Sequence, residues 1–365
     1  MKKIFLAATK QNDGKTTVAL GLIFNLKKRF KKIGFIKPIG QRYLVEEGEK
    51  VDEDSVLIER VFESLGIKHN LKDMSPIAVQ RGFTEKYILN PDKEKLTDQI
   101  NKSFSRIAKD KELVIIEGTG HAGVGSVFDH CNASVAKLLG AKVILISSGG
   151  IGRPIDEIVL NQSLFEKRGI QLAGVIINKV LPEKFPKINR LIRRGLARKG
   201  IEVLGVIPYL RLLSYPSIEQ ILQETDFKLL SGELGLNNLV KKIVVGAMMP
   251  HNALNYLVDR ALLITPGDRE DMILASLGCH FFRSAKEVRI SGIILTGNLI
   301  PHKTVMNMMQ QVKIPVLLAK ADTYSVAATI HDLMVKIRPK DKQKIEAVEK
   351  IVNKHVDLDK ILERL

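Results

Sequence analysis

The chain has 365 residues, 45% of them hydrophobic, which is enough for two or three domains with separate cores. Its 57 lysines and arginines outnumber its 40 aspartates and glutamates, and the formal net charge is +17. No segment approaches the roughly 20 apolar residues of a membrane-spanning helix, so we do not expect a membrane protein. The two cysteines, Cys131 and Cys279, lack metal-site spacing and indicate reduced thiols in a cytoplasmic protein.

The positive charge is spread along the chain, with local concentrations at residues 27–32 and 190–199. Such a charge favours contact with polyanions. However, no nucleic-acid recognition motif or aromatic–basic alternation accompanies it, and both segments are typical of solvated helix faces. Nucleic-acid binding is therefore not the expected function, although a polyanion-binding protein remains an alternative.

The first motif lies in residues 4–20, where a short apolar run leads through a polar loop into an apolar helical pattern. Backbone amides at a helix start and a lysine ammonium can surround nucleotide phosphates, and a threonine hydroxyl can bind Mg²⁺. Thr9 stands where the usual P-loop begins with glycine, and Lys10 is the extra lysine that marks the deviant P-loop ATPases, which commonly work as dimers. A structural turn is the alternative. The predicted nucleotide-binding residues are Thr9, Asn12, Asp13, Gly14, Lys15, Thr16 and Thr17.

Up to about residue 225, apolar runs rich in β-branched residues alternate with longer helical segments. This alternation predicts a doubly wound, mostly parallel α/β sheet, in which ligands bind at the carboxyl ends of the strands. The predicted strands are Lys3–Ala8, Ile33–Pro38, Leu113–Glu117, Lys142–Ser147, Leu172–Asn178 and Val203–Ile207.

A second, smaller α/β pattern begins at about residue 239, after a mixed segment at 214–238. Its expected strands are 243–249, 260–266, 291–297 and 316–320. The tail, residues 341–365, is charged and helical with one apolar face. We therefore expect two domains, at residues 1–225 and 239–365.

Three charged residues lie where a P-loop enzyme needs them. Lys37, before Pro38 at a strand end, could neutralise a transferring phosphoryl group or hold an anionic substrate; a solvated lysine is the alternative. An acidic cluster at residues 52–54, Asp-Glu-Asp, opens a helix over 56–61, where its carboxylates could cap the helix, and Asp54 could also coordinate Mg²⁺. Glu117 ends an apolar strand and could be a second Mg²⁺ ligand, although strand-end glutamates are often merely solvated.

Two further strand ends could contact the base of a nucleotide. The Asn178 amide can both donate to and accept from adenine. Pro208 ends the next strand, where free backbone groups could meet the base. Each signal is weak by itself.

Taken in order, these motifs resemble the dethiobiotin synthetase family over roughly residues 1–225. The resemblance implies a P-loop sheet, usually dimeric, in which ATP phosphorylates a substrate carbamate before ring closure. It also implies phosphate and Mg²⁺ binding by Lys15 and Thr16, and a metal site completed by Asp54 and Glu117. Lys37 would contact the carbamate or the transferred phosphate, and Asn178 the adenine.

The loop from Glu117 to Gly123 departs from the family's Glu-Gly-Ala-Gly-Gly pattern, so we expect an altered substrate region. The sequence more closely resembles the N-terminal region of long bacterial phosphotransacetylases, which shares the Lys-Pro-Ile and Gly-Val-Ile-Pro strand ends. In those enzymes a DRTGG domain follows, which residues 239–355 resemble. Asp268 and Arg269 match its name-giving pair, while Glu270 and Asp271 replace the later threonine and glycine; a plain turn and helix cap is the alternative.

We therefore predict a Mg²⁺-dependent ATP-binding enzyme, a ligase or synthetase that activates a carboxylate or carbamate by phosphoryl transfer and takes a small carboxylate or amine as substrate. Positioning and charge neutralisation would come from Lys10, Lys15, Lys37 and Mg²⁺. The alternative is a regulatory protein that senses adenine nucleotides and hydrolyses ATP slowly or not at all. The transacetylase domain that follows in the resembling enzymes is absent from this sequence, so acetyl transfer is not expected.

Overall fold

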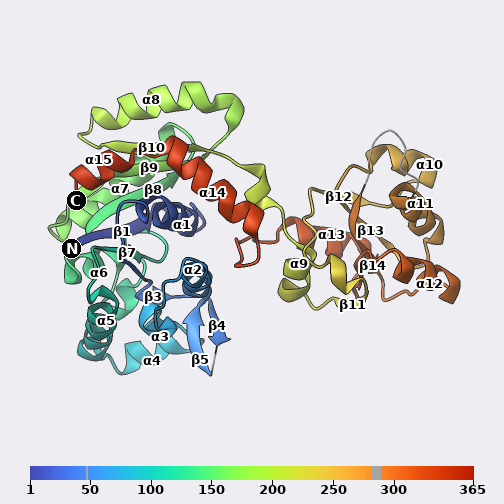
Figure 1. Cartoon of the computed structure of the whole chain (residues 1–365), viewed down its shortest axis with the longest axis horizontal. Helices are drawn as coiled ribbons and strands as arrows, with labels where there is room; N and C mark the ends of the chain where they lie inside the picture. The colour runs from blue at the N-terminus through green and yellow to red at the C-terminus, as the bar shows by residue number, and fades with distance from the viewer. Residues whose placement is uncertain (47, 282–288) are drawn as a thin grey trace. The chain divides into compact units, whose positions relative to one another are not determined.

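The structure is a computed structural model that describes residues 1–46, 48–281 and 289–365. The chain forms two compact units (Figure 1). The first contains residues 1–210 and 337–365, and the second contains residues 211–336. The second unit is therefore inserted into the chain of the first.

The first unit is built on a six-stranded parallel sheet with the order β10-β9-β8-β1-β7-β2. The strands are almost continuously apolar and buried, because helices cover both faces. This confirms the predicted doubly wound α/β sheet. The strands are β1 (Lys2–Ala8), β2 (Ile33–Ile36), β7 (Leu113–Glu117), β8 (Lys142–Ser148), β9 (Leu172–Val180) and β10 (Val203–Pro208).

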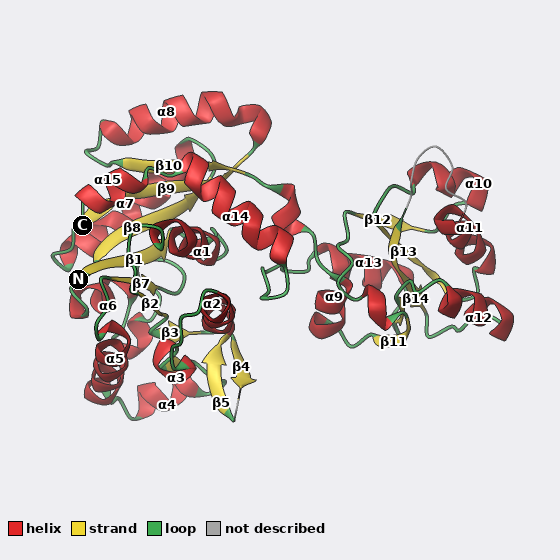
Figure 2. Cartoon of the chain, viewed as in Figure 1, coloured by secondary structure: helices red, strands yellow, loops and turns green. Residues whose placement is uncertain are grey.

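With the right-handed crossovers usual in parallel sheets, this strand order puts helix α1 on one face of the sheet and the helices that lead into β7, β8, β9 and β10 on the other. Figure 2 shows α14 beside α1. The longer helices are α1 (Lys15–Leu26), α2 (Glu53–Ser64), α5 (Lys93–Ala108), α6 (Asn132–Leu138), α7 (Gly152–Lys167), α8 (Phe185–Ala197) and α14 (Lys342–His355). Shorter elements are β3 (Ile39–Gly40), β4 (Tyr43–Glu46), β5 (Glu49–Asp52), α3 (Leu71–Met74), β6 (Ile77–Ala78), α4 (Phe83–Leu89) and α15 (Leu358–Glu363).

The C-terminal tail packs on the first unit, which differs from the boundary expected from the sequence. Val356 forms a β-bridge with Gly205 on the outer edge of β10, and the Asp357 amide donates to the Leu204 carbonyl at 2.8 Å. The apolar face of α14, predicted from the sequence, covers α1 rather than the second sheet. The tail thus completes the first unit by covering a helix and a free strand edge.

The second unit begins near residue 211 and contains a five-stranded sheet with the order β11-β15-β14-β13-β12. Four strands are parallel, and β11 joins one edge antiparallel. Apolar clusters lie on both faces, one with Met272 and Met309 and the other with Ile221 and Val326. Its elements are α9 (Ile218–Glu224), β11 (Lys228–Ser231), β12 (Lys242–Val245), α10 (Pro250–Ala253), β13 (Ala261–Pro266), α11 (Glu270–Phe281), β14 (Ile290–Thr296), α12 (Lys303–Gln311), β15 (Val316–Leu318) and α13 (Thr323–His331).

Short 3-10 helices connect some of these elements, at Ser126–Phe128, Pro182–Lys184, Arg211–Ser214, Glu233–Gly235 and Leu254–Tyr256. Within the described residues, no helix combines the length and apolar character that crossing a bilayer requires.

Candidate functional site

The polar loop between β1 and α1 is folded by its own side chains. Gly14, just before α1, has a φ of 94°, a left-handed conformation that glycine adopts without steric cost. The Thr9 hydroxyl donates to Asp13 Oδ2 at 2.8 Å, and the Lys10 amide donates to the same oxygen at 3.1 Å. Thr9 therefore has a structural role at the position where the usual motif has glycine. The Lys10 and Thr17 side chains are half-buried, and Asn12 is exposed.

The end of strand β9 holds this loop from the side. Asn178 Nδ2 donates to the Asp13 carbonyl at 2.9 Å, and Lys179 Nζ donates to the Asn12 carbonyl at 2.6 Å. Asn178 Oδ1 accepts from the Lys179 amide at 2.9 Å, so both polar atoms of the Asn178 amide already have backbone partners. Pro208 lies on the neighbouring edge strand, opposite Val180. Sequence reasoning missed the contact that Lys179 makes.

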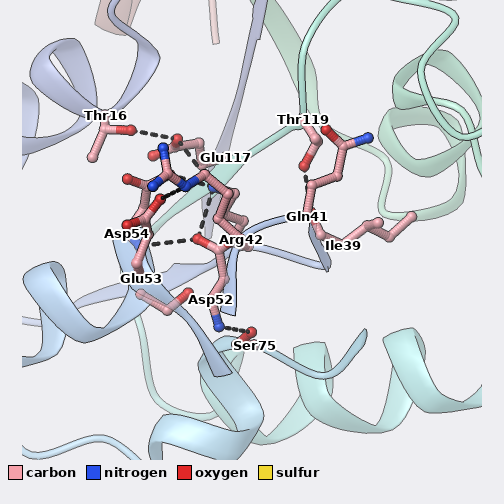
Figure 3. Close-up of polar contacts among 12 residues, drawn as sticks. Thr16, Ile39, Gln41, Arg42, Asp52, Glu53, Asp54, Ser75, Glu117 and Thr119 are labelled. Carbon is pink, nitrogen blue, oxygen red and sulfur yellow. Dashed lines mark hydrogen bonds and ion pairs between the residues drawn. The ribbon is translucent and has the colours of Figure 1, made fainter. Parts of the chain in front are cut away.

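Thr16 and Glu117 meet at the start of α1. Strands β1 and β7 are neighbours, and Glu117 lies opposite Leu6 in their register. The Thr16 hydroxyl donates to Glu117 Oε1 at 2.8 Å (Figure 3). Glu117 is only 1% exposed, and its second oxygen, Oε2, has no hydrogen-bond partner among the described residues. The carboxylate at the end of β7 therefore faces the phosphate loop.

Lys37 lies within the same group of side chains. Its ammonium is 2.8 Å from Asp52 Oδ1, 3.9 Å from Glu117 Oε1 and in direct contact with Asp54 Oδ2. Because Lys37 is only 6% exposed, the alternative interpretation of a solvated lysine is wrong. The structure thus brings together Thr16, Lys37, Asp54 and Glu117 from four separate segments of the sequence.

Burial and the neighbouring charges change the proton affinities of these groups. Burial, with the nearby Asp54 carboxylate, raises the pKa of Glu117 to about 7, although Lys37 and Lys15 act in the opposite direction. Burial alone would lower the pKa of Lys37, but the attraction of Asp54, Asp52 and Glu117 raises it well above its ordinary value. Burial lowers the pKa of Lys15, a change that Glu117 partly opposes. The surrounding carboxylates therefore favour the charged form of Lys37.

The oxygen donors near Thr16 match what Mg²⁺ prefers. Mg²⁺ binds carboxylate and hydroxyl oxygens and usually retains water and phosphate ligands, so a few protein donors suffice. Thr16, Asp54 and Glu117 supply such donors, and Glu117 Oε2 is a buried oxygen without a partner in the described chain. Within residues 1–46, 48–281 and 289–365, no three or more histidine, cysteine, aspartate or glutamate side chains form a metal cage. The residues fit Mg²⁺ held jointly with a phosphate, rather than a protein-only metal site.

Asp52 is a charged member of this group that was not among the predicted site residues. It is 1% exposed and contacts Lys37, yet in the sequence it was only part of an acidic cluster. Its position directly before a helix indicated a cap, which hid the ion pair.

The DRTGG-like signature serves the fold of the second unit. Arg269 donates to both carboxylate oxygens of Asp271, at 2.8 and 3.0 Å, and to the Met248 carbonyl at 3.0 Å. A β-carbon on Gly267 would lie 1.8 Å from the Leu299 carbonyl oxygen, so this glycine is required by the close approach of the backbone. The Arg269 guanidinium is therefore held by protein groups.

Comparisons with known proteins give a family match for each of the two domains. Residues 2–217 match the AAA domain family, and residues 220–333 match the DRTGG domain. The phosphate acetyltransferase of Nitratidesulfovibrio vulgaris is 27% identical over 371 residues, covering 99% of this chain and 51% of that enzyme. The phosphate acetyltransferase of Pseudomonas aeruginosa is 27% identical over 381 residues, covering 100% of this chain and 52% of the enzyme. The chain spans about half the length of the curated relatives it matches.

Among solved structures, the MinC:MinD cell division complex of Aquifex aeolicus has a TM-score of 0.38 and 18% identity, covering 59% of this chain and 84% of the other. This likeness is too weak to define the fold, which the strand order of the six-stranded sheet establishes. The family match covers more than half of the chain, and the relatives extend it through the second unit. The chain therefore belongs to the AAA domain family and joins a P-loop, nucleotide-binding domain to a DRTGG domain, as expected of the N-terminal region of long phosphotransacetylases.

Proposed function

We propose that the first unit binds ATP together with Mg²⁺ on the loop between β1 and α1. The observation that carries this proposal is the 2.8 Å contact between Thr16 Oγ1 and Glu117 Oε1, next to the buried Lys15. A hydroxyl and a carboxylate at the start of a helix, beside a lysine, are the groups that a metal–triphosphate complex needs. Bound Mg²⁺ would neutralise charge on the phosphate oxygens.

In this proposal each residue has a separate task. Lys15 and the amides of residues 13–17 hold the phosphates, while Thr16, Asp54 and Glu117 hold Mg²⁺. Lys37 stabilises the transferred phosphoryl group or a small anionic acceptor, such as a carboxylate or carbamate, because its buried ammonium lies at the same edge of the sheet. Asn178 and Lys179 fix the loop, and any contact between Asn178 and adenine uses the remaining capacity of its amide.

A second candidate function is regulatory: the protein binds adenine nucleotide and turns it over slowly or not at all. The observation in its favour is the path of the chain. The second unit ends at residue 336, and the chain continues directly into α14, which packs on α1, the helix that begins at the phosphate loop. A nucleotide-dependent movement of α1 would therefore reach the connection to the second unit within one helix.

A homodimer and a cytoplasmic location are part of the proposal. The resemblance to deviant P-loop ATPases supports the dimer, and the free thiols of Cys131 and Cys279 suit a reducing compartment.

Isothermal titration calorimetry with ATP, with and without Mg²⁺, tests the binding proposal. We expect Mg²⁺-dependent binding that Lys15→Ala abolishes. Lys167→Ala is the matched control, because it removes an exposed lysine at the end of α7. Binding that Lys15→Ala leaves intact would contradict the proposal.

ADP release separates the two candidate functions. An enzyme should release ADP faster when small carboxylates or diamines are added one at a time, since the acceptor completes the reaction. Turnover that none of these compounds changes, together with tight Mg·ATP binding, would favour the regulatory protein.

A further inference from the structure

Three buried carboxylates surround the single ammonium group of Lys37, those of Asp52, Asp54 and Glu117. Glu117 also accepts a hydrogen bond from Thr16. Asp52 differs from Glu117, because its carboxylate contacts Lys37 and the backbone amide at the start of α2. Within the described part of the chain, Asp52 Oδ2 has no hydrogen-bond partner.

Helix capping does not explain a charged residue at this position. Asp52 Oδ1 accepts from the Asp54 amide at 2.9 Å, the usual cap of a helix start. Serine or asparagine would cap the helix equally well without burying a charge, which is costly when the charge is poorly paired. Gly40 adds a constraint, because a β-carbon there would lie 2.5 Å from both Cβ and Oδ2 of Asp52. The close packing of Gly40 therefore limits where the Asp52 carboxylate can lie, and Lys37 is the charged residue that it contacts.

We propose that Asp52 is a positioning residue, which keeps the Lys37 ammonium beside the phosphate loop when Mg²⁺ engages Asp54 and Glu117. This inference rests on the proposed function. Lys37 shares those two carboxylates with the proposed metal ligands, so a bound cation competes with Lys37 for them and also repels it. Asp52 is not among the proposed ligands, so its carboxylate, 2.8 Å from the Lys37 ammonium in this structure, would stay available to Lys37.

A double-mutant cycle on Mg·ATP affinity tests this role in the full-length chain. The variants are Asp52→Asn, Lys37→Met and the two combined, and asparagine retains the helix cap. We expect Asp52→Asn to weaken Mg·ATP binding at least about tenfold, as for the loss of a hydrogen bond to a charged group. In the Lys37→Met background the same substitution should change nothing, because a positioning residue acts only through its partner.

Asp73→Asn is the matched control. Asp73 is also a buried aspartate bonded to a basic side chain, 2.8 Å from Arg106 Nε, but it lies outside the site, and its loss should leave Mg·ATP affinity unchanged. Equal or tighter binding by Asp52→Asn would overturn the role, as would an equal loss in the Lys37→Met background. If Lys37→Met does not fold, a crystal structure of Asp52→Asn with Mg²⁺ and an ATP analogue decides, since an unmoved Lys37 would overturn the role. A wild-type protein that binds no Mg·ATP overturns the proposed function itself, which is a distinct result.

Discussion

Val352 of α14 packs so closely on Gly21 of α1 that a β-carbon at position 21 would lie 2.3 Å from Val352 Cγ2. Both residues are buried. The C-terminal tail therefore packs against the helix that begins at the phosphate loop. Enlarging Gly21 or truncating Val352 should change this contact.

The first prediction concerns this contact. Gly21→Ala should lower the free energy of unfolding by about 1–3 kcal/mol, because overpacking outweighs the better helix propensity of alanine. In a Val352→Ala background the same change should cost less, because the two valine methyl groups, 2.3 and 3.0 Å from the added β-carbon, are absent while the β-carbon of residue 352, at 2.6 Å, remains. Urea unfolding followed by circular dichroism measures both, since the chain has no tryptophan.

Gly278→Ala is the control for helix propensity, because a β-carbon there would meet no atom of the described residues within 4 Å. It should not destabilise the protein. Additive effects of Gly21→Ala and Val352→Ala would show that the two helices do not pack as described.

The second prediction concerns pH. The folded-state pKa of Glu117, about 7, lies above the ordinary value of 4.5, so the folded protein binds this proton more tightly than the unfolded chain. The contribution of Glu117 to stability is therefore most favourable below pH 4.5, falls between pH 4.5 and 7, and is less favourable by roughly 3 kcal/mol above pH 7. Glu117→Gln should remove this slope, so that its stability relative to the wild type increases from pH 5 to pH 8.

Urea unfolding at several pH values checks this slope. Glu166→Gln, which removes an exposed carboxylate from α7, should keep the wild-type slope. A Glu117→Gln protein with the same pH dependence as the wild type would show that Glu117 is not the buried acid described here.

The third prediction separates two roles of Asn178. Asn178→Ala leaves the Asp13 carbonyl and the Lys179 amide without their side-chain partner, at a cost of about 1–3 kcal/mol in stability. If Asn178 acts through the loop, affinities for Mg·ATP, Mg·GTP and tripolyphosphate should fall by similar factors. A loss confined to ATP would instead indicate direct recognition of adenine. Calorimetry on the three ligands distinguishes these outcomes.

The fourth prediction concerns Arg269. Arg269→Lys cannot reproduce the two-pronged contact with Asp271 and the bond to the Met248 carbonyl, so we expect a loss of about 1–3 kcal/mol in the stability of the second unit. Mg·ATP affinity should be unchanged. Arg211→Lys is the control, because Arg211 is an exposed arginine of the second unit. A thermal unfolding midpoint of Arg269→Lys equal to that of the wild type would contradict this role.

Local patterns were sufficient to predict the first sheet and the phosphate loop. The strands are continuous apolar runs with clear ends, and the Gly14-Lys15-Thr16 motif marks the point where the loop after β1 becomes helix α1. The meeting of Thr16 with Glu117 could also be expected, because parallel strands place their carboxyl ends at one edge.

Long-range contacts could not be predicted in the same way. The apolar face of α14 was visible in the sequence, but its partner was not, because the pattern shows that a face is buried and not what covers it. Asp52 resembled a helix cap, and its ion pair depends on the packing of Gly40 and Lys37 around it. Asn178 was predicted to contact the base, and its hydrogen bonds to the Asp13 carbonyl and the Lys179 amide could not be seen in the sequence.

A crystal structure of the protein soaked with Mg²⁺ and a non-hydrolysable ATP analogue tests the central claim most directly. The account predicts phosphate oxygens beside Lys15 Nζ and Mg²⁺ in contact with Thr16 and Glu117, whose present hydrogen bond the metal replaces. A nucleotide bound elsewhere, or a loop that stays empty with Thr16 still bonded to Glu117 at saturating ligand, would contradict it.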